Sequence, residues 1–288
     1  NDGTGKIIIY KVTGSDKNYG DMIDTLESNG IPVYIGSNAD LVKDADVVVY
    51  TSAINQHDPE FVRAKSLGIP TYERAKFLGL LLTSYKMPIC ICGTHGKTTT
   101  TSMITQILLE GECDPTISVG GILHSIGGNV RVGKSDIFVT EACEYTNSFL
   151  SFNPTMDVIL NVKADHLDFF KDIDDIRNSF RLFTERLPED GTLIINTDID
   201  DYKYFFSESS CEVITVGSSS ETSMYSPADI TFDDSGCCSY KLVVNNEASF
   251  NSSFTDSESN GAVVNLSVPG IHNVYNSLAA IAVARKLG

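Results

Sequence analysis

The sequence is short of positive charge. It has 21 Lys and Arg residues against 38 Asp and Glu residues, which gives a formal net charge of −17 at pH 7. A surface that acidic repels the phosphate backbone of nucleic acids, so we expect no nucleic-acid partner. A site for a phosphorylated ligand would need local cations or main-chain amides, and the negative field would favour Mg²⁺.

The sequence also lacks zinc-type cysteine spacing and membrane-length apolar runs. None of its seven cysteines forms a CxxC pair, and Cys90 and Cys92 alternate with isoleucines, as core residues of a strand do. This usage predicts a reducing, cytoplasmic compartment. No apolar stretch approaches the ~20 residues of a membrane helix, so we expect no membrane span, and we expect no signal peptide.

Strand and helix patterns alternate along the chain, which predicts an α/β protein with a parallel sheet. The run 46–54 is apolar enough to predict a strand buried on both faces. A hinge near residues 84–88 divides the 288 residues into expected domains 1–87 and 88–288. In the first domain we predict strands at 7–16, 31–36, 46–54 and 69–72, and helices at 21–30, 58–68 and 73–82.

In the second domain the same patterns continue to the end of the chain. The helix at 172–188 is amphipathic, with Ile173, Ile176, Phe180, Phe183 and Leu187 on one face. The stretch 201–260 is rich in Ser, Asp and Glu and predicts short antiparallel strands with exposed loops. We predict further strands at 88–92, 114–121, 135–141, 156–162 and 191–198, and helices at 97–111 and 273–288.

A glycine-rich loop, GTHGKTT at residues 93–99, stands between a predicted buried strand and a helix. Glycines let main-chain N–H groups turn toward an anion, and the helix N-terminus adds partial positive charge. Lys97 can reach the outer phosphates of a nucleotide, and the hydroxyl of Thr98 can bind Mg²⁺. The alternative is a glycine turn with a helix-capping threonine.

Acidic side chains and a histidine follow two other predicted strands. Glu141 ends the strand 135–141, at the edge where ligands gather in parallel sheets, and we favour it over nearby Glu144 as a metal ligand. Either carboxylate could instead make an ordinary strand-end salt bridge. His166 follows the strand 156–162 and is a candidate second metal or phosphate ligand, or else a core or capping histidine. Asp168 would orient His166 or cap the next turn.

The start of the last helix carries a pair of asparagines. Asn273 and Asn276 are three residues apart, so they share a helix face beside His272. An asparagine can both donate to and accept from an adenine edge. The alternative is N-capping of the helix, which would require one of them.

Four motifs in a fixed order resemble the Mur ligases of cell-wall synthesis: GTHGKTTTT, EACEYTNSFL, ILNVKADHLDFF and PGIHNVYNSLAA. The segments VTGSD and 46–79 also resemble the first domain of that family. The resemblance covers nearly the whole chain. It implies an α/β fold with an incomplete Rossmann-like N-terminal domain for the UDP-linked substrate. It also implies a P-loop NTPase-like central domain with a mixed, mostly parallel sheet.

Within the family, the motifs are most similar to those of members that join L-alanine to UDP-N-acetylmuramate. The implied reaction is ATP-dependent peptidoglycan synthesis, in which the lactyl carboxylate becomes an acyl phosphate that the amine attacks, with ATP and Mg²⁺ as cofactors. A sibling that recycles murein tripeptide is the alternative enzyme, and Leu167 after the Asp–His pair favours the L-alanine-adding one. The alternative outside catalysis is a nucleotide-binding remnant.

The resemblance also implies roles for individual residues. Lys97, Glu141 and His166 would be catalytic, and Thr98, Glu141 and His166 would hold Mg²⁺. The UDP-linked substrate would lie near Ser15, Asp16, Ser52 and Asn129, each of which could instead be turn chemistry. The implied ATP-binding residues are Gly93, Thr94, His95, Gly96, Lys97, Thr98, Thr99, Asn273 and Asn276.

The sequence departs from the family pattern at both ends. The family's first strand and glycine-rich loop are not supplied by residues 1–6, and the sequence stops at about the end of the family's central domain. We therefore expect a fragment, or an ordered part of a longer protein, that is inactive on its own. The sequence makes no prediction of the oligomeric state.

Overall fold

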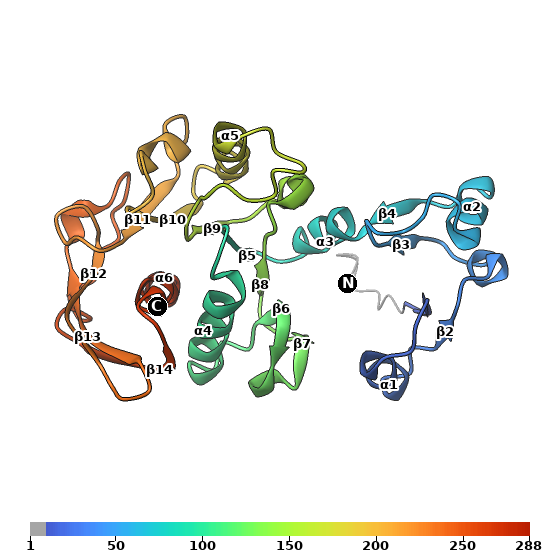
Figure 1. Cartoon of the computed structure of the whole chain (residues 1–288), viewed down its shortest axis with the longest axis horizontal. Coiled ribbons are helices and arrows are strands. Elements are labelled where there is room, and N and C mark those ends of the chain that lie inside the picture. The colour runs from blue at the N-terminus through green and yellow to red at the C-terminus, as the bar shows by residue number, and fades with distance from the viewer. Residues whose placement is uncertain (1–9) are drawn as a thin grey trace. The chain divides into compact units, whose positions relative to one another are not determined.

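The computed structural model describes residues 10–288, so the first part of the predicted strand 7–16 lies outside the described residues. The chain divides into two compact units, one ending at Phe77 and the other running from Leu78 to Gly288. Figure 1 shows the elements of both.

The first unit contains two short parallel strand pairs. Strand β1 (Gly14–Asp16) pairs with β2 (Val33–Ile35), and β3 (Val48–Tyr50) pairs with β4 (Thr71–Glu73). The helices predicted at 21–30, 58–68 and 73–82 all form, whereas the short helix at 39–42 was not predicted. At the start of the second helix, Asp58 accepts hydrogen bonds from the amides of the first turn, and a proline follows it. The helical segments are α1 (Asp21–Ser28), η1 (Ala39–Val42), α2 (Pro59–Ser66) and α3 (Arg74–Leu82), the last reaching into the second unit.

The prediction that residues 46–54 form a strand buried on both faces is wrong. The strand is present but short, and Val47 and Val49 are each 43% exposed. The reason is its pairing: within residues 10–288, β3 has β4 as its one strand partner, in a two-stranded sheet. A strand in so small a sheet has too few neighbours to cover its side chains.

The second unit is built on one ten-stranded sheet with the order β14-β13-β12-β11-β10-β9-β5-β8-β6-β7. Its central pairs are parallel, and β7, β13 and β14 join antiparallel, so the predicted mixed, mostly parallel sheet is confirmed. The strands are β5 (Met87–Cys92), β6 (Thr116–Leu123), β7 (Gly128–Arg131), β8 (Ile137–Glu141), β9 (Met156–Ile159), β10 (Thr192–Asn196), β11 (Glu212–Val216), β12 (Tyr225–Phe232), β13 (Cys237–Val244) and β14 (Val263–Pro269).

Helices cover both faces of the sheet centre. In Figure 1, α4 and α6 lie on one side of β5, β9 and β10, and α5 lies on the other. Ile89 and Ile91 of β5 pack in one core cluster with Leu108 of α4 and Leu278 of α6. Each fully buried side chain of this kind stabilises the fold by about 1.5–3 kcal/mol. The helices are α4 (Lys97–Glu110), α5 (Ile173–Thr184) and α6 (His272–Leu287), with short 3-10 segments η2 (His124–Ile126), η3 (Tyr145–Ser151), η4 (Tyr202–Phe206) and η5 (Asn246–Ala248).

The amphipathic helix α5 forms largely as predicted. Asp172 caps it by accepting a hydrogen bond from the amide of Asp175 at 3.0 Å. Phe180 and Phe183 are fully buried against Phe149 of η3. Of the predicted apolar face, Ile173 in the first turn is 37% exposed, since it lies at the end of the helix.

The Ser- and Asp-rich stretch forms antiparallel strands, as predicted, except for β11, which runs parallel to β10. The loop before β14 is held by Asp256, which is 1% exposed and accepts hydrogen bonds from Tyr225 and Arg285. Hydrogen bonds from Ser259 and Arg285 lower the pKa of this buried carboxyl to about 2, although burial opposes the shift. Within residues 10–288, no helix is long and apolar enough to cross a membrane.

Candidate active site

The glycine loop joins β5 to α4, as the sequence predicts. Gly93 has φ 140° and Gly96 has φ 89°, values that other residues rarely adopt. A Cβ at Gly93 would lie 3.1 Å from Cβ of Leu160, and one at Gly96 would lie 2.7 Å from Oδ1 of Asn276. The two glycines are therefore needed both for the turn and for the close packing of the loop on β9 and α6.

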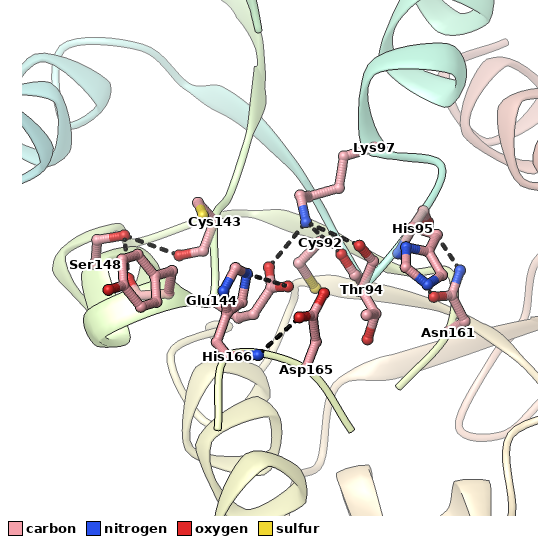
Figure 2. A network of polar contacts seen from close by, with 12 residues as sticks. Cys92, Thr94, His95, Lys97, Cys143, Glu144, Ser148, Asn161, Asp165 and His166 are labelled. Carbon is pink, nitrogen blue, oxygen red and sulfur yellow. Dashed lines mark hydrogen bonds and ion pairs between the residues drawn. The ribbon is translucent and has the colours of Figure 1, made fainter. Parts of the chain in front are cut away.

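Lys97 at the start of α4 points back over the loop. Its ammonium donates to the carbonyl of Gly93 at 2.6 Å and to Oε2 of Glu144 at 2.9 Å (Figure 2). The side chains of Lys97 and Glu144 are 17% and 3% exposed. The carboxylate that neutralises the loop lysine is thus Glu144, a residue that the sequence offered only as the less favoured metal ligand.

The second oxygen of Glu144 is the least satisfied atom of the site. Oε1 is buried, lies 3.9 Å from Nε2 of His166, and has no hydrogen-bond partner among residues 10–288. A buried carboxylate oxygen without a partner is costly. This oxygen can therefore accept a proton-bearing group or a cation next to Lys97 and His166.

The main chain beside Glu144 and His166 is strained. Thr146, Asn147 and His166 have φ of 55°, 58° and 52°, in the left-handed region. Such conformations cost on the order of 1–3 kcal/mol each and cluster at functional sites. They place Glu144 and His166 where regular strand or helix geometry would not.

Tyr145 packs its ring against the ring of His166. Its ring lies 4.6 Å from the His166 ring, centre to centre, and its hydroxyl donates to Oδ2 of Asp168 at 2.7 Å. Asp168 therefore holds Tyr145, whose ring in turn lies beside the ring of His166.

Glu141 and Thr98 each lie beside one of the two neighbouring glycines of β6, Gly120 and Gly121. Oε1 of Glu141 accepts a hydrogen bond from the amide of Gly120 at 2.6 Å. Thr98 lies against the next glycine, since a Cβ at Gly121 would be 3.3 Å from Cγ2 of Thr98. The structure thus brings two of the three predicted metal ligands to the same glycine pair of β6, while the third, His166, lies next to Glu144.

The paired asparagines stand at the start of α6, where the sequence predicts them. Asn276 donates to Oδ1 of Asn273 at 2.9 Å, and Asn273 donates to the carbonyl of Pro269 at 2.8 Å. In the described chain neither side chain caps the helix, so the N-capping alternative is wrong. A cavity of about 550 Å³ opens beside Asn276, with His95, Gly96, Asn161, Lys163, His272 and Tyr275 among its lining residues.

A thiol and a carboxyl lie in the sheet beneath the loop. Cys92 donates from Sγ to Oδ1 of Asp157 at 3.4 Å, and Asp157 is fully buried. Burial raises the pKa of Asp157 to about 7. Burial and the Asp157 carboxylate raise the pKa of Cys90 and Cys92 as well, so these two cysteines are inert core residues, as predicted.

The residues predicted near a UDP-linked substrate are spread over both units. In the first unit, Ser15 donates to Oε2 of Glu60 at 2.8 Å, Asp16 accepts from the amide of Asn18 at 2.9 Å as in a turn, and Ser52 is exposed. Asn129 is half-buried on β7, in the second unit.

Sequence reasoning missed Asn161 and Tyr145. Asn161 hydrogen-bonds the main chain of His95 from the end of the β9 segment (Figure 2). The sequence did contain a signal for Asn161, because a polar residue directly after a buried strand often contributes to a site at that edge of the sheet. Tyr145 carried no comparable signal, because its contacts depend on the irregular turn that follows Glu144.

Comparison with known proteins assigns both units to domains of one family. Residues 91–284 match the Mur ligase middle domain, and residues 10–86 match the Mur ligase family, catalytic domain. The chain is 57% identical over 289 aligned positions to a UDP-N-acetylmuramate–L-alanine ligase of Lachnospira eligens, covering 99% of this chain and 60% of that protein. A protein of the same name from Agathobacter rectalis is 48% identical, with 97% and 58% covered. The chain thus spans about 60% of the length of these relatives.

Two solved structures share the fold over 96% of this chain. The UDP-N-acetylmuramate-alanine ligase of Thermotoga maritima matches with a TM-score of 0.78 and 26% identity, over 96% of this chain and 59% of that one. The UDP-N-acetylmuramate:L-alanyl-gamma-D-glutamyl-meso-diaminopimelate ligase from Neisseria meningitides matches with a TM-score of 0.80 and 26% identity, over 96% of this chain and 86% of that one. The fold alone does not separate these two kinds of enzyme.

Proposed function

The chain belongs to the Mur ligase family, and on that premise we propose that it carries the ATP site of an enzyme that joins L-alanine to the lactyl carboxylate of UDP-N-acetylmuramate. The carrying observation is the loop between β5 and α4, where Lys97 and Glu144 form a buried ion pair. We infer L-alanine as the acceptor from the names of the two relatives that are 57% and 48% identical to this chain.

The loop supplies the groups that bind and polarise phosphates. The free amides at the N-terminus of α4 and the positive φ values of Gly93 and Gly96 suit an anion. Lys97 is the proposed catalytic cation, because negative charge shifts between phosphate oxygens during transfer and a fixed ammonium stabilises it. A triphosphate and a carboxylate repel each other, so this charge also lets the two substrates approach.

Mg²⁺ fits the donor set of the site. Thr98 offers a hydroxyl in the first turn of α4, Glu141 offers a carboxylate beside Gly120, and His166 offers an imidazole beside the unpartnered oxygen of Glu144. In the described part of the chain no three His, Cys, Asp or Glu side chains form a metal cluster by themselves. That suits Mg²⁺, which binds one or two carboxylates and takes its other ligands from substrate phosphates and water. Bound there, Mg²⁺ would neutralise phosphate charge.

The cavity beside α6 is the proposed adenosine site. Asn276 lines it and is oriented by Asn273, so the two asparagines have unequal roles. Residues 88–288 would then form the ATP-binding domain. Residues 1–87 would form the domain for the UDP-linked substrate, with Ser15, Asp16 and Ser52 as its proposed contacts. We place the enzyme in the cytoplasm, where its nucleotide substrates are.

The first test is nucleotide binding by the chain itself. Calorimetry with ATP or ADP should show binding that needs Mg²⁺ and is lost in Lys97→Ala. Equal binding by parent and variant would rule out the loop as the phosphate site.

The second test separates the two candidate ligases in the protein that carries this chain. Free L-alanine and the L-alanyl-γ-D-glutamyl-meso-diaminopimelate tripeptide are offered as acceptors with UDP-N-acetylmuramate and ATP. Faster ligation of L-alanine supports the proposal. Faster ligation of the tripeptide supports the alternative, the murein-tripeptide ligase. The Neisseria meningitides structure, with its TM-score of 0.80, is the reason to test this alternative.

A further inference from the structure

Asn161 makes two hydrogen bonds to one residue of the glycine loop. Its Oδ1 accepts from the amide of His95 at 2.9 Å, and its Nδ2 donates to the carbonyl of His95 at 2.8 Å. The side-chain amide therefore pairs with both main-chain groups of His95 as a neighbouring strand would (Figure 2).

The main chain on either side of Asn161 continues this pairing. Leu160 donates to the carbonyl of Cys92 at 3.1 Å, and Thr94 donates to the carbonyl of Asn161 at 3.0 Å. The amide of Lys163 donates to Oγ1 of Thr94 at 2.9 Å. The β5–β9 ladder thus runs past the last strand residues and includes the first half of the glycine loop.

The segment that holds the loop also reaches the other parts of the site. Asn161 and Lys163 line the cavity of about 550 Å³ together with His95 and Gly96. Three residues after Lys163 stands His166, beside Glu144. One short segment therefore connects the loop, the cavity wall and the His166 turn.

We propose that Asn161 is a positioning residue for the nucleotide: its side chain fixes the main chain of His95, and so the direction of the loop amides, before the nucleotide arrives. This rests on the proposed ATP-binding function. A loop that is held in its binding conformation loses less entropy on binding, so the affinity for the nucleotide is higher. Because the pairing is to the main chain, it does not depend on the imidazole of His95.

The test uses Asn161→Ala and Asn161→Asp in the chain, with ADP and Mg²⁺ as the probe. Asn161→Ala removes both bonds, so the exchange of the His95 amide with solvent should accelerate and nucleotide binding should weaken at least about tenfold. Asn161→Asp keeps the acceptor for the His95 amide, so protection of that amide should persist. Its carboxylate would face the carbonyl of His95 and the phosphates, so binding should still weaken.

The matched control is Asn245→Ala. Asn245 also makes two side-chain bonds to main chain, to the carbonyl of Ser220 at 2.8 Å and from the amide of Glu247 at 3.1 Å, away from the loop. Its loss should leave His95 exchange and nucleotide affinity unchanged.

Three results would overturn the role of Asn161. These are unchanged His95 exchange in Asn161→Ala, faster exchange with unchanged nucleotide affinity, and an equal loss of affinity in Asn245→Ala. A parent chain that binds no nucleotide would instead overturn the proposed function, and would do so whatever the exchange data show. The two failures are therefore distinguishable.

Discussion

The ammonium of Lys97 lies 2.9 Å from a carboxylate oxygen of Glu144, and the Glu144 side chain is 3% exposed. The loop lysine is therefore part of an ion pair whose carboxylate is buried, and its charge matters for stability as well as for binding. A buried charge that loses its partner is strongly destabilising, whereas loss of both charges is far better tolerated.

Lys97→Ala should therefore lower the free energy of unfolding by about 3 kcal/mol, because it leaves the Glu144 carboxylate buried and unpaired. The double variant Lys97→Ala/Glu144→Gln should recover most of that loss but bind no nucleotide. Urea unfolding of parent, single and double variants measures this. If the double variant were as unstable as the single one, the ion pair would not be the cause.

Glu141→Gln should raise the Mg²⁺ concentration needed for nucleotide binding by about tenfold, because it removes one negative charge at the proposed metal position. The amide keeps an oxygen that can accept from Gly120, so the fold should be unaffected. Calorimetric titration at several Mg²⁺ concentrations is the measurement. Glu110→Gln, at the far end of α4, is the control and should behave as the parent. An unchanged Mg²⁺ requirement in Glu141→Gln would exclude Glu141 as a ligand.

Gly96→Ala should destabilise the loop more than a positive φ alone explains, because its Cβ would lie 2.7 Å from Oδ1 of Asn276. The matched control is Gly36→Ala. Gly36 has φ 92°, close to the 89° of Gly96, and no atom of the described chain lies within 4 Å of its Cβ position. The control should cost about 1 kcal/mol and Gly96→Ala about 1–3 kcal/mol more. Thermal unfolding of both variants checks this, and equal losses would contradict the clash.

Asp157 should make the fold less stable as the pH rises. Burial raises its pKa in the folded chain to about 7, above the roughly 3.9 of an unfolded carboxyl. Between these two values the folded state holds the proton and the unfolded state does not, so the free energy of unfolding falls as the pH rises toward 7. Asp157→Asn cannot ionise, so its melting temperature should fall less than that of the parent between pH 5 and pH 8. Asp174→Asn, at an exposed position of α5, should follow the parent. A parallel decline in all three proteins would contradict the role of Asp157.

The elements that the sequence predicts well are those with a repeating pattern or a strong end signal. The strand 88–92 is continuously apolar, and α5 repeats its apolar residues along one face and starts at a capping aspartate. These local patterns hold because the surrounding ten-stranded sheet buries them. In the two-stranded β3–β4 pair the same apolar signal is misleading, because Val47 and Val49 are exposed.

Within the candidate site, the sequence places the residues on the correct elements but cannot assign their contacts. Glu141 is the last residue of β8 and Glu144 follows three positions later, so the sequence shows two carboxylates at this strand end but not the partner of each. The main chain turns at Thr146 and Asn147 decide that Glu144 meets Lys97 while Glu141 meets Gly120. Such irregular turns follow no periodic pattern. For the same reason the pairing of Asp168 with Tyr145 could be found only in three dimensions.

The bond between His95 and Asn161 joins residues 66 positions apart in the chain. A ribosome adds about 5–20 residues per second, so the glycine loop waits roughly 3–13 s after its own synthesis before the residue that shapes it exists. The contact of Gly96 with Asn276 comes later still, because that residue lies in the last helix. During translation, therefore, the glycine loop is made early and reaches its final packing only after Asn276 has been synthesised.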